Sequence, residues 1–268
     1  MTKAKTVQTL IDEWSSIDQL LAELPEEQWK TPTALPGWSV QDVVAHIVGT
    51  ELNLSGKQPP EVPGVREYPH VHNDIAALNE CWVESMRAQS PADVHRLFRE
   101  ATATRAEALT AMSEEDFDAP SWTPAGQDTY ARFMRIRVFD CWMHEQDVRE
   151  AVDRPGHESG DPAEMSLDEI SVALGYIVGK KAKAPQGSSV TFDLDGPVRR
   201  RLHVQVDGRA TVVPQLAGEA TATLTMSSTV FTRLAGGRMP VELGFGRTTV
   251  KGDADLAEKV AFALPFTI

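Results

Sequence analysis

Apolar residues recur every three or four positions through the first half of the chain, which is the spacing of one buried face of an α-helix. The first such stripe occupies residues 7–24, and Pro25 is expected to end its helix. Ser39 is a natural N-cap for a second helix over residues 40–54. Further helical patterns cover residues 73–89, 91–112 and 128–152. Among these five patterns, four main helices joined by loops predict an up-and-down bundle.

A polar segment around Pro155 predicts a linker between domains of residues 1–155 and 156–268, and beyond residue 181 the hydrophobic period shortens from 3.6 to 2. After one more helix, over residues 167–181, alternation predicts several strands. The strands are expected at residues 202–206, 210–213, 222–226 and 248–251. Short helices are expected at 228–234, with Ser228 as the cap, and at 253–264. The pair Asp207-Gly208 predicts a hairpin turn. The predicted fold class is therefore two-domain α+β, a four-helix bundle followed by a small α/β domain.

Charge and composition narrow the class of protein. The net charge of -13 disfavours nucleic acid as a partner, because phosphate binding needs a basic surface. No apolar run is long enough to span a membrane, and the amino-terminal residues do not resemble a signal peptide, so we expect a soluble, cytoplasmic protein without a membrane partner. Two cysteines, Cys81 and Cys141, are too few for a disulfide framework or a cysteine-rich zinc site and are expected to be packed core residues.

A carboxylate and a histidine share one face of the helix predicted over residues 128–152. Asp140 and His144 are four residues apart within its apolar stripe, so both need polar partners. They can satisfy each other as a structural pair, or they can bind a metal ion. His46, on the helix over residues 40–54, can be a surface residue paired with Asp42 or the third ligand. Two histidines and one carboxylate would leave coordination positions open, as catalytic zinc sites do.

The other polar residues give weaker signals. Asp147, one turn beyond His144, can accept the second ring N–H of that histidine, or it can pair with Arg149. Three further histidines have no ligand-like neighbours in the sequence: His95, His157 and His203. The chain contains no glycine-rich phosphate loop, no nucleophile-elbow motif and no dinucleotide-binding fingerprint.

Two separated motifs resemble those of the mycothiol-dependent maleylpyruvate isomerase family, which belongs to the DinB-like metal-binding bundles. The first is PGWSVQDVVAH, which ends at His46, and the second joins Asp140, His144 and Asp147. Residues 234–238 and 250–257 are also similar to that family. The resemblance implies a DinB-like bundle followed by a sterol-carrier-like domain. It also implies metal ligands at His46, Asp140 and His144, although the family has glutamate where this chain has Asp140.

The resemblance further implies a zinc ion, or another divalent metal, and mycothiol as the thiol cosubstrate. In that family the thiolate adds to a conjugated cis double bond, the resulting single bond rotates, and elimination gives the trans isomer. An arginine of the carboxy-terminal domain takes part, for which Arg238 and Arg247 are the candidates here. The expected partners are thus a small-molecule thiol and an electrophilic substrate. Two alternatives are a mycothiol S-transferase for electrophile detoxification and a non-catalytic metal-binding or regulatory protein.

Overall fold

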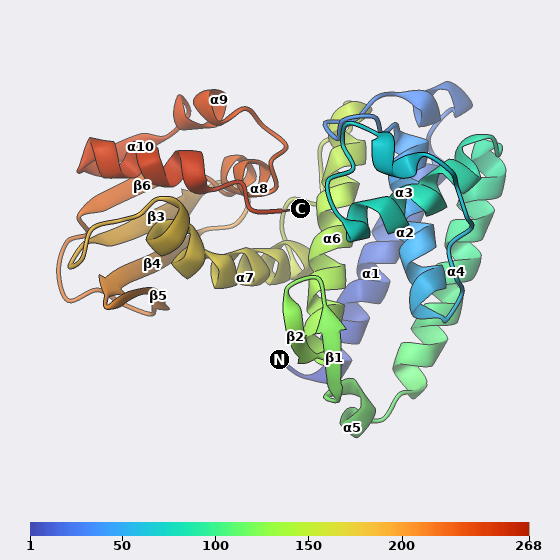
Figure 1. Cartoon of the computed structure of the whole chain (residues 1–268), viewed down its shortest axis with the longest axis horizontal. Helices are drawn as coiled ribbons and strands as arrows, with labels where there is room; N and C mark the ends of the chain where they lie inside the picture. The colour runs from blue at the N-terminus through green and yellow to red at the C-terminus, as the bar shows by residue number, and fades with distance from the viewer. Residues whose placement is uncertain (268) are drawn as a thin grey trace. The chain divides into compact units, whose positions relative to one another are not determined.

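The computed structural model describes residues 1–267, drawn in Figure 1. Contacts divide the chain into two compact units, Met1–His157 and a second unit that begins at Glu158. Helices dominate the first unit, and the second combines helices with a five-stranded sheet. The predicted α+β fold class is confirmed. No helix among the described residues is both long and apolar enough to cross a membrane.

Five long helices build the first unit. They are α1 (Lys3–Ala22), α2 (Val40–Leu54), α3 (Asp74–Arg87), α4 (Pro91–Ala111) and α6 (Tyr130–Ala151). Helix α2 packs against α3, α4 and α6, while α1 packs against α4 and α6, so α2 and α6 are neighbours in the bundle. Helix α2 begins as predicted. Ser39 accepts a hydrogen bond from the backbone N–H of Asp42, and the Asp42 side chain accepts from the backbone of Ser39, which forms a capping box.

A short hairpin precedes α6 where the sequence predicted only a loop. A single helical turn, α5 (Glu114–Phe117), leads into strands β1 (Pro120–Thr123) and β2 (Gly126–Thr129), which pair antiparallel. Each strand has four residues, which is too few for an alternating pattern to stand out. Thr129, at the end of β2, caps α6 by accepting from the backbone N–H of Arg132. The hairpin therefore fixes the start of the helix that carries Asp140 and His144.

The second unit begins with α7 (Asp161–Tyr176) and a π-helical turn (Ile177–Lys181). Its remaining elements are β3 (Ser189–Asp195), β4 (Arg200–Asp207), β5 (Arg209–Val213), β6 (Ala222–Ser227), α8 (Ser228–Ala235), α9 (Val241–Phe245), β7 (Thr249–Gly252) and α10 (Ala254–Ala263). The sheet order is β5-β4-β3-β6-β7, with β3 and β6 parallel and the other neighbours antiparallel. Helices α7, α8 and α10 all pack against strands of this sheet.

The strand predictions hold for β4 to β7, and the turn at Asp207-Gly208 joins β4 to β5 with Gly208 at a φ of 69°. Three details differ from the sequence analysis. The central strand β3 was not predicted, although Val190, Phe192 and Leu194 alternate with polar residues and are buried. Helix α7 begins six residues earlier than predicted, and Ser227, not Ser228, caps α8.

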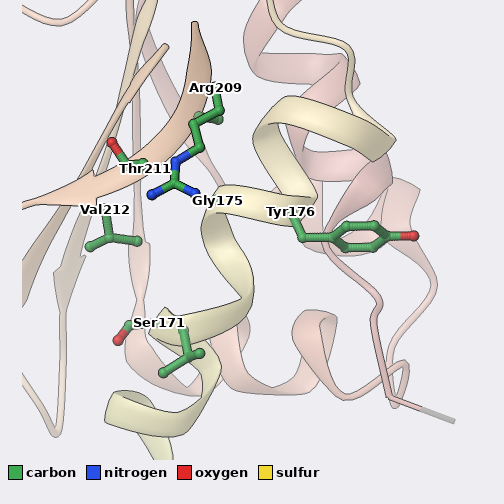
Figure 2. A pocket seen from close by; sticks show the side chains of 8 residues that line it. Ser171, Gly175, Tyr176, Arg209, Thr211 and Val212 are labelled. Carbon is green, nitrogen blue, oxygen red and sulfur yellow. The ribbon is translucent and has the colours of Figure 1, made fainter. Parts of the chain in front are cut away.

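An open pocket of about 410 Å³ lies between α7 and the edge strand β5 (Figure 2). Gly175 permits this close packing, because a Cβ there would lie 2.8 Å from the carbonyl oxygen of Ala210. Tyr176 and Val212 line the pocket and are exposed. None of the residues that line it was a candidate site residue in the sequence.

Candidate metal centre

The three predicted ligands come together in the first unit. The Nε2 atom of His46, on α2, lies 3.2 Å from Oδ2 of Asp140, on α6. The Nε2 atom of His144 lies 3.5 Å from Oδ1 of the same carboxylate. One ligand atom from each residue lies within 4.8 Å of the others. Packing of α2 on α6 thus joins positions 94 residues apart, which the spacing within α6 alone could not establish.

These separations suit a small divalent ion. Ligands bound to zinc at 2.0–2.1 Å in a tetrahedron are about 3.3 Å apart, close to both observed distances. Both imidazoles present Nε2 to Asp140, and the buried Nδ1 atom of His46 has no hydrogen-bond partner among the described residues. The side chain of Asp140 is 30% exposed, whereas those of the two histidines are 6% exposed. The carboxylate therefore gives the donor set an opening to solvent.

Asp147 orients His144. Its Oδ2 lies 3.1 Å from Nδ1 of the imidazole, and Asp147 is buried. Arg149, the alternative partner in the sequence analysis, binds Glu145 instead. A carboxylate on Nδ1 favours the tautomer whose Nε2 lone pair is free, which is the form that binds a metal. Of the two partners left open for Asp147 in the sequence analysis, His144 is therefore the one in contact with it.

Asp140 is joined to a buried network of ion pairs. Arg137 donates to Asp140 and also binds Glu51, with Nη2 2.7 Å from Oε1. Glu51 binds Arg105 as well, at 3.0 Å, and the three side chains other than Asp140 are at most 4% exposed. Burial alone would raise the pKa of Asp140, but the positive charges of Arg137 and the two histidines outweigh it and hold that pKa well below its usual range. The sequence analysis missed this network.

The two histidines have opposite protonation preferences. Burial lowers the pKa of His46, and the nearby charge of Asp140 only partly offsets it. Burial also acts on His144, but Asp140 and Asp147 together outweigh it and raise the pKa of His144. His46 is therefore readily neutral, whereas a metal ion that binds His144 must compete with a proton for the imidazole.

The surroundings of the site are apolar on one side and contain no reactive thiol. The Trp38 ring lies 5.3 Å from that of His46 and 6.2 Å from that of His144, and its Nε1 donates to Glu80. Cys141 follows Asp140 in the sequence, but it is fully buried and burial raises the pKa of its thiol. It is a packed core residue, as predicted, and not a nucleophile.

The two arginines predicted to act on substrate lie in the second unit. Arg238 follows α8, is partly exposed and binds the carbonyl oxygen of Gly236. Arg247 follows α9 and is exposed. Their roles in substrate binding stay predictions.

Two of the three histidines without ligand-like neighbours in the sequence, His95 and His157, lie beside carboxylates in the fold. The Nε2 atom of His95 lies 2.6 Å from Asp18, and Nδ1 of His157 lies 2.6 Å from Glu145. His157 and Glu145 also lie within reach of Glu13. Only the fold could reveal these neighbours, because 77 residues separate His95 from Asp18 and Glu13 is far from both of its neighbours in the chain.

Comparison with known proteins agrees with this architecture. The family described as the mycothiol maleylpyruvate isomerase N-terminal domain matches residues 10–149, and the MDMPI C-terminal domain matches residues 164–259. A crystal structure of the mycothiol-dependent maleylpyruvate isomerase is similar in fold, with a TM-score of 0.62, 15% identity and 95% of each chain covered. A histidine-to-alanine mutant of an isomerase of that name gives a TM-score of 0.60 at the same identity and coverage. No curated protein matches the sequence.

The two matched domains together cover most of the chain, in the order that the structure shows, and the bundle that holds His46, Asp140 and His144 falls within the first of them. The chain therefore belongs to the mycothiol maleylpyruvate isomerase family.

Proposed function

We propose that this protein is a metal-dependent enzyme that activates mycothiol for addition to an electrophilic substrate, in the manner of a maleylpyruvate isomerase. Membership of the family supports the use of mycothiol. The observation that carries the metal dependence is the convergence of His46, Asp140 and His144, with nitrogen-to-oxygen distances of 3.2 and 3.5 Å.

In this proposal His46 and His144 bind zinc or another divalent ion through Nε2, and Asp140 binds it through its carboxylate. An ion bound there would favour the thiolate form of an external thiol, which is the nucleophile needed for addition. Aspartate in place of the family's glutamate is one methylene shorter. The 3.2 Å approach of His46 supports the view that close packing of α2 against α6 compensates for this shorter reach.

Residues around the ligands prepare the site. Arg137 keeps Asp140 ionised and fixes its orientation, and Asp147 holds His144 in the tautomer that exposes Nε2. The Trp38 ring packs beside both imidazoles, with ring centroids 5.3 and 6.2 Å away. The nucleophile comes from outside the protein, since Cys141 is buried and its raised pKa keeps it protonated.

Arg238 and Arg247 are proposed as the groups that bind the substrate carboxylate and stabilise negative charge during addition. Arg238→Met and Arg247→Met, assayed separately, test which one takes part. The variant of the active arginine should raise the KM for an anionic substrate and lower kcat, while the other variant should behave like the wild type. Wild-type kinetics in both variants would remove the arginines from the mechanism.

The decisive assay measures turnover of maleylpyruvate by metal-loaded protein with and without mycothiol, beside conjugation of mycothiol to a model electrophile. Isomerisation that needs both metal and thiol supports the proposal. Conjugation without isomerisation would identify a mycothiol S-transferase. Turnover of neither compound would favour a non-catalytic metal-binding or regulatory protein. Asp140→Glu restores the family's usual ligand and should still bind metal, with an altered rate.

A further inference from the structure

A second group of potential ligands lies elsewhere in the helical unit. Glu13 from α1, Glu145 from α6 and His157 from the segment after α6 place one ligand atom each within 4.8 Å of the others. The Nδ1 atom of His157 lies 2.6 Å from Oε2 of Glu145 and 3.6 Å from Oε2 of Glu13. The two carboxylates are 0% exposed, and the imidazole is 26% exposed.

The Glu13 carboxylate accepts no hydrogen bond from the described residues. Both of its oxygens are buried, and Glu13 can hydrogen-bond Glu145 only when it carries a proton. An unpaired carboxylate in such a place costs several kcal/mol, so it must hold a proton or a cation. Its neighbour Glu145 is better satisfied, because Oε1 accepts from Ser16 at 2.6 Å and from Arg149 at 2.9 Å. The Oε2 atom of Glu145 remains on the side of His157 and Glu13.

The backbone holds His157 in place. Its φ is 54°, in the left-handed region that non-glycine residues rarely occupy. Its carbonyl oxygen accepts from the indole N–H of Trp142 at 2.9 Å and from Gln146 at 3.3 Å. Two side chains of α6 thus fix the segment whose imidazole faces Glu145.

We infer that Glu13, Glu145 and His157 form a second divalent metal site, distinct from the His46–Asp140–His144 site. Two carboxylates and one imidazole suit a borderline or hard ion such as Mn²⁺ or Zn²⁺. Arg149 pairs with Glu145, and His157 must be neutral to bind a metal, so in the metal-bound form the divalent ion supplies the positive charge for Glu13. A metal ion at this site would link α1 to α6 and to the segment that follows α6. The two buried carboxylates favour a stabilising role for this ion over a catalytic one.

Occupancy requires a small local change. The 2.6 Å separation between Nδ1 of His157 and Oε2 of Glu145 is a hydrogen bond, whereas two ligands of one ion at 2.0–2.2 Å lie about 3 Å or more apart. A metal ion must therefore displace the proton of that bond and separate the two atoms by roughly half an ångström. The competing occupant is a proton held by Glu13, whose pKa is raised by burial and by the charge of Glu145.

Metal content of the purified full-length chain tests the inference. The protein is incubated with Zn²⁺ or, separately, Mn²⁺, and bound metal is counted after removal of free ions. The wild type should hold two equivalents, Glu13→Gln and His144→Ala one each, and the double variant none. His95→Gln is the matched control. His95 also pairs with a carboxylate, that of Asp18, which Arg99 binds as well, but this group contains one carboxylate and not two. His95→Gln should hold two equivalents.

Glu13→Gln keeps the size of the side chain, and thermal unfolding shows whether each variant is folded. Added metal should raise the Tm of His144→Ala but leave that of the double variant unchanged. Equal metal content in His144→Ala and the double variant would overturn the inference, and so would failure of metal to stabilise His144→Ala. Neither outcome bears on the first site, because that site is judged by the equivalent of metal that His144→Ala loses relative to the wild type.

Discussion

The two histidine–carboxylate groups of the helical unit differ in exposure and in charge balance. At the first, Asp140 is 30% exposed and Arg137 neutralises it, so the donors face an opening and an external ligand can approach. At the second, Glu13 and Glu145 are completely buried, Arg149 pairs with Glu145, and the imidazole of His157 lies 3.6 Å from Glu13. Buried charge alone therefore does not identify a catalytic centre. The two groups expose different ligands, because the carboxylate of Asp140 is 30% exposed at the first and the imidazole of His157 is 26% exposed at the second.

The largest expected effect comes from removing one histidine at each site. His144→Ala should lose its metal equivalent and fall to the background rate, because two remaining ligands cannot hold the ion in a catalytic geometry. His157→Gln should retain catalytic activity, because His157 belongs to the other group. Assays of metal-loaded protein, with circular dichroism to establish folding, measure both. Full activity in His144→Ala would contradict the proposed site.

Cys141→Ala tests whether a thiol of the protein, on the same helix as Asp140 and His144, is the nucleophile. The change should leave most activity intact, since the thiol is buried, although lost packing could cost about 1 kcal/mol of stability. Loss of activity in a folded Cys141→Ala protein would favour a protein thiol as nucleophile.

The next effect concerns the buried ions behind Asp140. Glu51→Gln leaves Arg105 and Arg137 without their shared carboxylate, and we expect a loss of about 3–5 kcal/mol in the free energy of unfolding. Denaturant titration measures it. Glu100→Gln removes an exposed partner of Arg96 and should leave the free energy of unfolding nearly unchanged. Equal costs for the two variants would show that the buried network adds no special stability.

A smaller effect is expected from the residue that orients His144. Asp147→Asn removes the carboxylate at Nδ1 and should weaken metal binding at the first site by about 10–100-fold. Competition with a chelator of known affinity measures the change. Metal bound at Glu13, Glu145 and His157 should be unaffected, so a parallel loss there would indicate a general defect in folding.

The smallest expected effects are the shifted pKa values of His46 and His144 in the metal-free protein. Imidazole resonances in NMR should titrate below the ordinary pKa of 6.5 for His46 and above it for His144. The stability linked to His144 is complete below 6.5 and is lost as the pH rises through its raised pKa. The stability linked to His46 is complete above 6.5 and is lost as the pH falls through its lowered pKa. Titration of both at 6.5 would contradict these assignments.

Local sequence patterns were sufficient to predict most of the elements and part of the site. The periodicity of apolar residues predicted the long helices, Ser39 marked the start of α2, and Asp207-Gly208 marked the hairpin turn. The four-residue spacing between Asp140 and His144 placed both on one face of α6, and the spacing to Asp147 predicted its contact with the imidazole. These features depend on interactions within one helix or turn.

The remaining features depend on packing between elements distant in sequence. Glu51 binds Arg137 across 86 residues, and no local pattern distinguishes that glutamate from an exposed one. Glu13 and Glu145 meet only because α1 packs against α6. His157 lies in a segment without helical or strand periodicity, so no local pattern places it beside two carboxylates.

The central claim is that His46, Asp140 and His144 bind one catalytic metal ion, and anomalous diffraction at the zinc edge from crystals of zinc-loaded protein tests it most directly. We predict a peak about 2.0–2.2 Å from Nε2 of each histidine and from a carboxylate oxygen of Asp140. A zinc-loaded crystal with no peak at these residues, or with His46 turned away from Asp140, would contradict the claim.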